Sequence, residues 1–291
     1  MGPEKFFLPG LIPDNGAFIP SGAVMAASLI DPALLVSRLG AIVGRVDVDS
    51  LESCDSTSSE LSRRATRGAP AGSVVVADRQ SAGRGRRGRD WVSSPEDSLT
   101  FSLLWRFAGG FDKVAGLSLA VGVAVARACE SLGAAGVVLK WPNDVLAPVP
   151  GGLGKLAGIL VELSSSRSGT EAIIGIGINL RAPAVSAPGG LAPAGLATLL
   201  GAVPERHDLL AALLRELVAV LDRFSRGGFA ALADDWQQRH AWQDCPVHLL
   251  EEGKVVASGL CRGADGDGAL LLEGPDGVLR HLAGDLSLRS L

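Results

Sequence analysis

The sequence predicts an α+β protein in which one large mixed domain is followed by a small all-β domain. From Arg45 onward, apolar runs typical of strands alternate with patterns typical of helices. After Trp242 the chain changes to short alternating segments separated by Gly and Asp, which is typical of a small antiparallel barrel. The chain has 291 residues, 47% of them hydrophobic, so it can bury a sizeable core.

Residues 1–44 form a predicted N-terminal extension. The stretch from Met1 to about Val24 contains Pro and Gly with little periodicity and is expected to be flexible, whereas Asp31 to Leu39 is expected to form a short helix. A basic region followed by an apolar core is absent from the first residues, which argues against a secretory signal.

Residues 45–241 carry the elements of the large domain. Strands are predicted at 72–77, 99–105, 136–140, 155–163 and 171–178, and helices at 113–132 and 207–224. The sequence Thr57-Ser-Ser-Glu60 also predicts a capping box that opens a helix. In the small domain, residues 242–291, strands are predicted at 246–250, 255–262, 269–273 and 278–282.

Composition and cysteine spacing exclude several classes of protein. A formal net charge of -4 gives no general reason to bind DNA or an anionic membrane. The four cysteines form no C-x-x-C pair, so we expect reduced thiols in a cytoplasmic protein and no metal site. The most apolar stretch, Ala115 to Cys129, is interrupted by Arg127, which argues against a membrane helix.

The segment Gly83-Arg84-Gly85-Arg86-Arg87-Gly88-Arg89 is the most informative motif. Glycine lets backbone amides approach an anion, and guanidinium groups pair with carboxylate or phosphate, so this loop suits a polyanionic ligand. A solvated basic loop is the alternative. The G-x-G-x-x-G pattern within it does not predict a dinucleotide site, because Trp91 to Pro95 shows no helix to hold pyrophosphate. No P-loop is present.

Further polar residues stand at the ends of predicted strands. Lys140-Trp141-Pro142-Asn143-Asp144 follows an apolar strand, and Lys155 heads another after a glycine-rich approach. Asn179 closes the strand in which Gly175 and Gly177 would admit a flat ligand. A plain turn and a surface lysine are the ordinary alternatives. The four histidines all lie in the C-terminal third, so a hydrolytic triad is not supported.

Together these segments resemble the biotin protein ligase family in order and spacing. The similarity extends from about Arg45 to the end, because 268–273 and 286–290 look like the family's C-terminal SH3-like domain. It implies that residues 45–241 form a catalytic domain related to class II aminoacyl-tRNA synthetases and lipoate ligases. The implied activity converts biotin and ATP to biotinyl-5'-AMP and pyrophosphate, then transfers biotin to a lysine of a biotin carboxyl carrier protein.

The resemblance also implies roles for individual residues. The implied biotin contacts are Ser56, Thr57, Ser58, Gln80, Arg84, Gly85, Arg86 and Lys155. The implied ATP and adenylate contacts are Arg84, Arg86, Arg87, Arg89, Trp91, Lys140, Asn143 and Asn179. Lys155 and Arg86 are the implied catalytic cations, and Mg²⁺ would accompany ATP. Asp144 is our candidate for orienting or deprotonating the acceptor lysine.

The arginine loop is expected to be mobile until an anion orders it, because four like charges repel. Two departures from the family pattern are apparent. Ser58 stands where Asn is common, which puts one polar contact in doubt, and 147–154 predicts a longer loop before Lys155.

Alternatives to biotin ligation remain at this stage. A lipoate or octanoate ligase-type acyltransferase shares the implied fold, and a non-catalytic biotin- or nucleotide-binding protein belongs to a different class. Only 44 proline-rich residues precede Arg45, so we expect no DNA-binding winged helix. The sequence leaves open whether the chain forms a homodimer.

Overall fold

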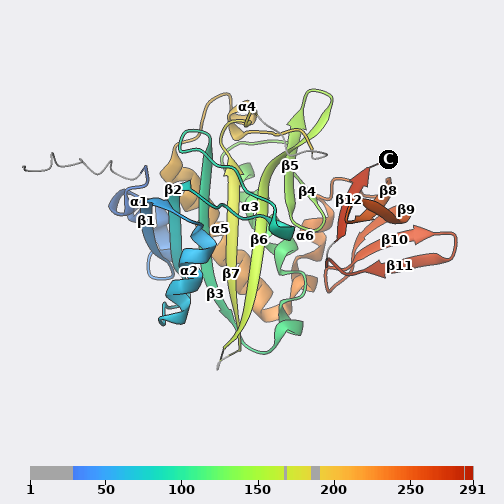
Figure 1. Ribbon diagram of the computed structural model, residues 1–291, viewed down its shortest axis with the longest axis horizontal. Helices are drawn as coiled ribbons and strands as arrows, with labels where there is room; N and C mark the ends of the chain where they lie inside the picture. The colour runs from blue at the N-terminus through green and yellow to red at the C-terminus, as the bar shows by residue number, and fades with distance from the viewer. Residues whose placement is uncertain (1–28, 167–168, 185–190, 285, 291) are drawn as a thin grey trace, which may run out of the picture.

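The computed structural model describes residues 29–166, 169–184, 191–284 and 286–290, so the segment predicted to be flexible, 1–24, lies outside the described residues. Two sheets dominate the fold (Figure 1). A seven-stranded sheet has the order β1-β2-β3-β7-β6-β5-β4, in which only β1 and β2 pair in parallel. A five-stranded antiparallel sheet has the order β11-β10-β9-β8-β12. This arrangement confirms the predicted α+β class with a small β unit after the large one.

The strands of the large sheet are β1 (Asp47–Cys54), β2 (Ser73–Gln80), β3 (Ser98–Phe107), β4 (Val138–Lys140), β5 (Asp144–Val149), β6 (Gly152–Ser166) and β7 (Gly169–Asn179). The small sheet contains β8 (Pro246–Glu251), β9 (Lys254–Ala264), β10 (Leu270–Gly274), β11 (Gly277–His281) and β12 (Leu286–Ser290). The α-helices are α1 (Pro32–Leu39), α2 (Thr57–Thr66), α3 (Leu117–Ser131), α4 (Leu196–Leu200), α5 (Arg206–Gly227) and α6 (Ala233–Gln237).

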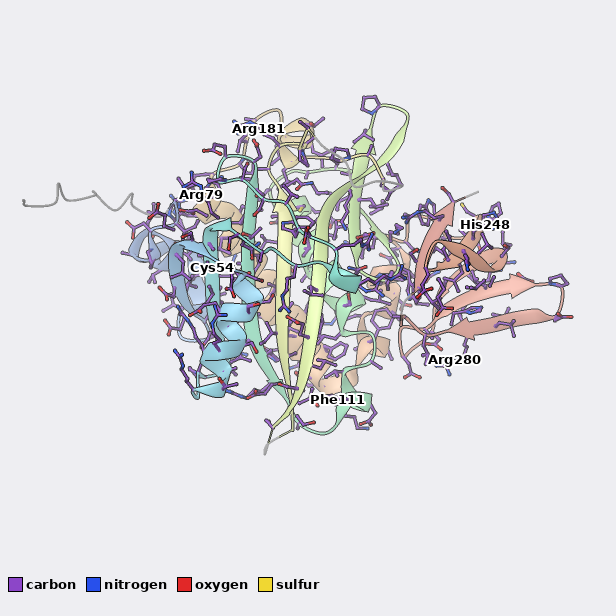
Figure 2. The ribbon with its side chains drawn as sticks, in the orientation of Figure 1. Cys54, Arg79, Phe111, Arg181, His248 and Arg280 are labelled. Atoms are coloured by element: carbon purple, nitrogen blue, oxygen red, sulfur yellow. The ribbon has the colours of Figure 1, made fainter. Side chains whose placement is uncertain are left out.

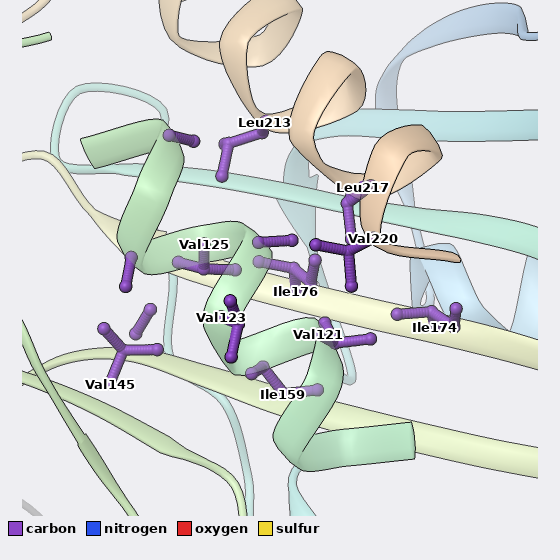
Figure 3. Close-up of a cluster of buried hydrophobic side chains, with 14 of the residues drawn as sticks. Val121, Val123, Val125, Val145, Ile159, Ile174, Ile176, Leu213, Leu217 and Val220 are labelled. Atoms are coloured by element: carbon purple, nitrogen blue, oxygen red, sulfur yellow. The ribbon is translucent and has the colours of Figure 1, made fainter. Parts of the chain in front are cut away.

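Alternation along the central strands gives the large sheet two apolar faces. Val74 and Val76 of β2 pack into the main core, whereas Val75 between them packs with Leu61 of α2 on the opposite face. Figure 3 shows the main core, where valines of α3 meet isoleucines of β6 and β7 and leucines of α5. Full burial of each such side chain contributes about 1.5–3 kcal/mol to folding.

The helix predicted at 113–132 is interrupted. A 3₁₀ turn, Phe111–Val114, precedes Gly116 at φ 75°, and α3 begins only at Leu117. A Cβ on Gly116 would lie 2.6 Å from Phe229 Cβ, so glycine allows the chain to turn close to this aromatic side chain. The segment Phe111–Ser131 is long and apolar enough to span a membrane. In this fold, 67% of its most apolar 18 residues are buried inside the protein, as in a core helix.

The start of α2 differs from the predicted capping box. Ser56 is the N-cap residue but its side chain makes no capping hydrogen bond, and Thr57 lies inside the first turn. Glu60 pairs instead with Arg63 and Arg64. The hydroxyl of Thr57 is drawn away from the helix end because it bonds to groups on the sheet.

The residues before Lys155 form a hairpin and not the longer loop expected from the sequence. Ala147, Pro148 and Val149 at the end of β5 pair with Gly154, Leu153 and Gly152 at the start of β6. Only residues 150–151 form the turn, with Gly151 at φ 87°. Lys155 therefore lies within a paired strand, which restricts its position more than a loop would.

Hydrogen bonds from the end of β4 connect the large sheet to the C-terminal part of the chain. Trp141, fully buried at the end of β4, donates from Nε1 to Gly268 O at 3.1 Å. Leu139 N donates to Arg239 O at 2.7 Å, and Ala241 N donates to Leu139 O at 2.8 Å. The short strand β4, at the edge of the large sheet, is thus held against the segment that leads to the small sheet (Figure 1).

Candidate active site

A buried network of hydroxyl and amide groups forms at the start of α2. The backbone N–H and the hydroxyl of Thr57 both donate to Gln80 Oε1, at 2.8 and 3.2 Å. Thr57 Oγ1 and Ser58 Oγ lie 2.8 and 3.0 Å from Ser102 Oγ. All four hydroxyl residues, Ser56 included, are buried. Because these hydrogen bonds occupy Gln80 Oε1, the amide nitrogen of Gln80 is the end that remains for a ligand.

Ser58 takes part in this network although it departs from the family pattern. A Cβ on Gly175 would lie 2.6 Å from Ser58 Oγ. Glycine at position 175 is therefore required for Ser58 to reach Ser102. The polar contact that was in doubt is therefore made inside the protein. The space beside Gly175 is filled by the side chain of Ser58 and is not open to a ligand.

The arginine loop, residues 83–89, follows β2 and closes on itself. Gly85 N donates to Arg89 O at 2.7 Å, and Trp91 N donates to Gly83 O at 2.8 Å. A Cβ on Gly83 would lie 2.3 Å from Trp91 O and 3.1 Å from Gln80 Nε2, so glycine is needed for this close approach. Only a 3₁₀ turn, Arg86–Gly88, occurs in the loop. No helix follows the loop up to residue 97, so the G-x-G-x-x-G pattern lacks the helix N-terminus that a dinucleotide motif requires.

A cavity of about 470 Å³ lies between the arginine loop and β6. Its walls are residues 82–90 together with Leu160 and Glu162, so all four loop arginines border it. Arg84 forms an ion pair with Glu162, while Arg87 and Arg89 are exposed. The concentration of guanidinium groups around one cavity suits a ligand with several negative charges. Lys155 does not line this cavity, and its Nζ lies 5.7 Å from the centre of the Trp91 ring.

Arg86 connects the loop to two other parts of the fold. Its Nη1 donates to Asn143 Oδ1 at 3.0 Å, and its Nη2 donates to the backbone oxygen of Gly284 in the C-terminal segment. Asn143 is held in turn by a 2.8 Å bond from its Nδ2 to Ile159 O. The loop is therefore anchored by polar contacts that an incoming anion can replace.

Two lysines share one buried carboxylate at the edge of the site. Asp144 Oδ2 lies 2.8 Å from Lys140 Nζ, and Asp144 Oδ1 lies 2.7 Å from Lys155 Nζ. The antiparallel β4–β5 pair places Lys140 opposite Asp144, and β6 brings Lys155 to the other side. The side chain of Lys140 is 2% exposed, whereas that of Lys155 is 32% exposed. Lys155 is thus the member of this triad that a ligand can reach.

Charge and burial act in opposite directions on this triad. Burial alone would raise the pKa of Asp144, but the two lysines hold it well below its usual range. Burial lowers the pKa of Lys140, which Asp144 only partly offsets, and the positive charges of Arg289 and Lys155 lower it further. Asp144 therefore stays ionised and is a weak proton acceptor.

Trp91 covers the sheet next to Lys155. A Cβ on Gly177 would lie 2.2 Å from Trp91 Cε2, so the indole lies directly on the glycine backbone. Lys155 Nζ lies 5.7 Å from the centre of the ring, within cation–π distance. Trp91 Nε1 is buried and has no hydrogen-bond partner among the described residues. The flat surface predicted at Gly177 exists, and the protein's own indole occupies it.

Asn179, at the end of β7, is 6% exposed. Its Nδ2 donates to Lys155 O and Ala194 O at 3.2 and 3.1 Å. Both hydrogens of the amide are therefore used inside the protein, which leaves Oδ1 as the group that can accept from a ligand.

Three residues of the site escaped sequence reasoning. Ser102 lies within an apolar strand, and only the fold places it beside Thr57. Trp242 lies with its ring centre 5.7 Å from Lys140 Nζ, although it comes from the segment before β8. Arg289 of β12 is close enough for its charge to affect Lys140. In the sequence, Arg289 is the basic residue of 286–290, the segment that resembles the family's C-terminal domain.

Three histidines, His207, His240 and His248, make their contacts outside the candidate site. His207 Nε2 accepts from Asp31 N at 2.9 Å, and His240 stacks on Trp236. His248 lies in the small sheet, beside Ser258 (Figure 2). None of these three contacts a nucleophilic side chain of the site described above.

The chain is similar to known ligases. Residues 51–179 match the biotin/lipoate A/B protein ligase family. The chain is 37% identical over 270 residues to the bifunctional ligase/repressor BirA of Escherichia coli, covering 90% of this chain and 81% of that protein. It is 39% identical over 234 residues to a biotin–[acetyl-CoA-carboxylase] ligase of Paracoccus denitrificans, covering 77% of this chain and 92% of that protein.

A solved structure gives the same result. A biotin protein ligase from Aquifex aeolicus, in complex with biotin and ATP, superimposes with a TM-score of 0.71 at 29% sequence identity. The superposition covers 84% of this chain and 99% of that one. The similarity therefore includes nearly the whole of the solved protein and is not confined to the matched segment.

Proposed function

The chain belongs to the biotin protein ligases of the biotin/lipoate A/B protein ligase family, and from this premise we propose how its residues divide the reaction. In the first step a carboxylate oxygen of biotin attacks the α-phosphorus of ATP, which forms biotinyl-5'-AMP and releases pyrophosphate. In the second step a lysine amine of a carrier protein attacks the acyl carbon and AMP leaves.

The network at the start of α2 is our proposed pocket for the ureido ring of biotin. Ser56, Thr57, Ser58 and Gln80 surround it, and Gln80 Oε1 is already bonded to Thr57. The free amide nitrogen of Gln80 then donates to the ureido oxygen. Gly85, Arg84 and Arg86 form the loop over the ring and its carboxylate tail.

Lys155 is our proposed catalytic cation, and its position is the single observation that carries the proposal. Its ammonium is fixed 2.7 Å from Asp144, beside Trp91 and the arginine loop, and remains partly exposed. A fixed cation here neutralises the negative charge that builds up as carboxylate oxygen meets phosphorus. Arg86 supplies a second positive charge once it leaves Asn143 and Gly284.

The proposed nucleotide site uses the rest of the predicted set. Arg84, Arg87 and Arg89 border the cavity in which the phosphates would lie. Trp91 offers an aromatic surface for adenine, and Asn179 Oδ1 an acceptor for its amino group. Lys140 and Asn143 hold the wall behind Lys155 and Arg86. Mg²⁺ would arrive bound to the ATP phosphates, whose charge it shares with these arginines.

For the transfer step we propose that Asp144 orients groups and does not deprotonate the acceptor. The two lysines that hold its pKa low make it a poor base. It keeps Lys155 directed at the adenylate, where the lysine stabilises the charge on the departing AMP.

We propose that 45–241 act as the catalytic domain and 242–291 as an SH3-like domain. The partner would be the biotin carboxyl carrier domain of a carboxylase in the cytoplasm, with no DNA or membrane involved. The acetyl-CoA carboxylase in the name of the Paracoccus relative supports this class of partner. A homodimer is compatible with this assignment and is tested by measuring mass in solution with and without biotin and ATP.

The experiment that tests the transfer step mixes the purified chain with biotin, ATP, Mg²⁺ and a biotin carboxyl carrier domain. We expect one biotinyl group on the carrier's acceptor lysine, detected by peptide mass mapping. A carrier with that lysine replaced by arginine is the matched control and should remain unmodified. Adenylate formation without any transfer to the carrier would contradict the proposed partner.

A further inference from the structure

Two of the four cysteines lie opposite each other where the small sheet begins. In the β8–β9 pair Pro246 lies opposite Leu260, so the next position of the same register places Cys245 opposite Cys261. Cys261 N donates to Cys245 O at 2.9 Å, and Asp244 N donates to Cys261 O at 2.8 Å. Asp244 and Cys245 therefore share one partner residue, as in a β-bulge.

Both thiols are on the inner face of the small sheet. Cys245 is in alternation with Val247 and Leu249, which are fully buried. Cys261 is also fully buried, and Cys245 packs against the same core. Opposed residues in a ladder have Cβ atoms about 4.5–5.5 Å apart, and a disulfide needs about 3.5–4.5 Å. A small local shift is therefore enough to bring the two sulfurs into bonding distance.

We propose that Cys245 and Cys261 form a redox-sensitive pair, which a hydroperoxide converts to an intramolecular disulfide. The Cys245 sulfur first attacks the peroxide oxygen, which gives a sulfenic acid and releases an alcohol or water. The Cys261 sulfur then attacks the sulfenic sulfur, and water leaves. Two thiols are oxidised, one peroxide is reduced, and one sulfur–sulfur bond forms.

The surroundings of the thiols set the order of these steps. Cys245 is half-buried and its thiol donates to Gln243 O at 3.4 Å, so an oxidant can reach it first. Burial raises the pKa of Cys261 to about 11, so its thiolate is scarce at neutral pH and ring closure is slow. The other two cysteines are elsewhere: Cys129 is fully buried in α3, and Cys54 ends β1 in the large sheet (Figure 2).

The cysteine pair is connected to the candidate active site through Trp242. Cys245 N donates to Trp242 O at 3.2 Å, and the Trp242 ring lies over Lys140. A disulfide here would tie β9 to the segment that carries Trp242. The modification would therefore stiffen the connection between the two sheets without touching Lys155 or the arginine loop.

The test treats the reduced full-length chain with hydrogen peroxide, blocks the remaining thiols under denaturing conditions, and maps the peptides by mass spectrometry. We expect a peptide pair linked through Cys245 and Cys261, lighter by about 2 Da than the sum of the reduced peptides. Two of the four thiols should be lost. This measurement on the wild type needs no variant to fold.

Two variants complete the experiment. Cys245→Ser should abolish the linked peptide, and Cys54→Ser, the matched control, should leave it unchanged. The proposal is overturned if all four thiols of the wild type remain free, if Cys245 stops at a sulfinic acid or a mixed disulfide, or if the disulfide joins a different pair of cysteines.

Discussion

Lys155 Nζ lies 2.7 Å from Asp144 Oδ1, and the same carboxylate holds Lys140 through its other oxygen. The Asp144 carboxylate therefore positions the partly exposed ammonium of Lys155 and compensates the charge of the buried Lys140. Lys155 and the four arginines of residues 83–89 outnumber the nearby carboxylates of Asp90, Asp144 and Glu162, which favours binding of the biotin carboxylate and the ATP phosphates.

Asp144→Asn should reduce adenylation by about 100-fold, because Lys155 loses its anchor and Lys140 its counter-charge. The rate of pyrophosphate exchange measures the first step, and transfer from preformed adenylate measures the second. The lowered pKa of Asp144 means that its pairing is intact above the ordinary carboxyl pKa of 3.8 and is lost only as pH falls through the lower folded value. Neutral-pH activity should therefore show no titration of Asp144.

Asp97→Asn provides the control for this prediction. Asp97 also pairs with an arginine, Arg181, but its side chain is 44% exposed. Its replacement should leave both steps within about twofold of the wild type, as expected for a surface ion pair. Equal rates for Asp144→Asn and the wild type in both steps would rule out the positioning role.

Thr57→Val should raise KM for biotin by about tenfold with little change in kcat. The valine removes the hydroxyl that joins Gln80 to Ser102, and each broken buried hydrogen bond costs about 1–3 kcal/mol. Steady-state exchange at varied biotin measures both constants. Thr66→Val at the other end of α2, where the hydroxyl donates to Arg63 O, is the control. A fall in kcat at unchanged KM would argue against a biotin pocket here.

Arg86→Gly should shorten the retention of biotinyl-adenylate by about tenfold or more, because a charge-assisted contact over the anhydride is lost. Rapid desalting of enzyme loaded with labelled biotin measures retention over time. Arg226→Ala, an exposed position at the end of α5, controls for loss of an arginine. Identical release curves for Arg86→Gly and the wild type would contradict closure of the loop.

His240→Phe should make the protein less sensitive to acid. Burial lowers the pKa of His240 to about 4 from 6.5, so the unfolded chain takes up a proton before the folded one as pH falls. The free energy of unfolding should therefore decrease between pH 6.5 and 4, by about 3 kcal/mol at most from this residue. Phenylalanine keeps the stack on Trp236 and removes the titration.

Urea unfolding at neutral and acidic pH measures this difference. His248→Phe is the control, because His248 bonds to Ser258 in the small sheet and its replacement should leave the acid-dependent loss in place. If His240→Phe lost stability with falling pH as steeply as the wild type, His240 would not be the cause.

The sequence predicted most strands from their apolar runs but missed β1, β5 and β12. β2, β3, β6 and β7 follow apolar runs, but β1, with the sequence Asp-Val-Asp-Ser-Leu-Glu-Ser-Cys, is a polar edge strand that no periodicity marked. β5 was missed because the predicted loop before Lys155 contains two prolines. Both elements owe their structure to pairing with a neighbour and not to local preference.

The residues of the candidate site were proposed from the sequence, but their contacts with one another were not. Family resemblance identified Lys140, Asp144 and Lys155 from their motifs, whereas their sharing of one carboxylate depends on the pairing of three strands. Ser102 and Trp242 carried no local signal, because a serine in a strand and a tryptophan before one are ordinary features. Tertiary structure alone brings them to the site.

The most direct test of the account is biotin-dependent exchange of pyrophosphate into ATP, with lipoate and octanoate as parallel substrates and Lys155→Ala as the variant. We expect exchange with biotin alone, reduced by at least about 100-fold in Lys155→Ala, because the fixed cation at the reacting phosphorus is lost. Exchange with lipoate or octanoate in place of biotin, or full biotin-dependent exchange without Lys155, would contradict it.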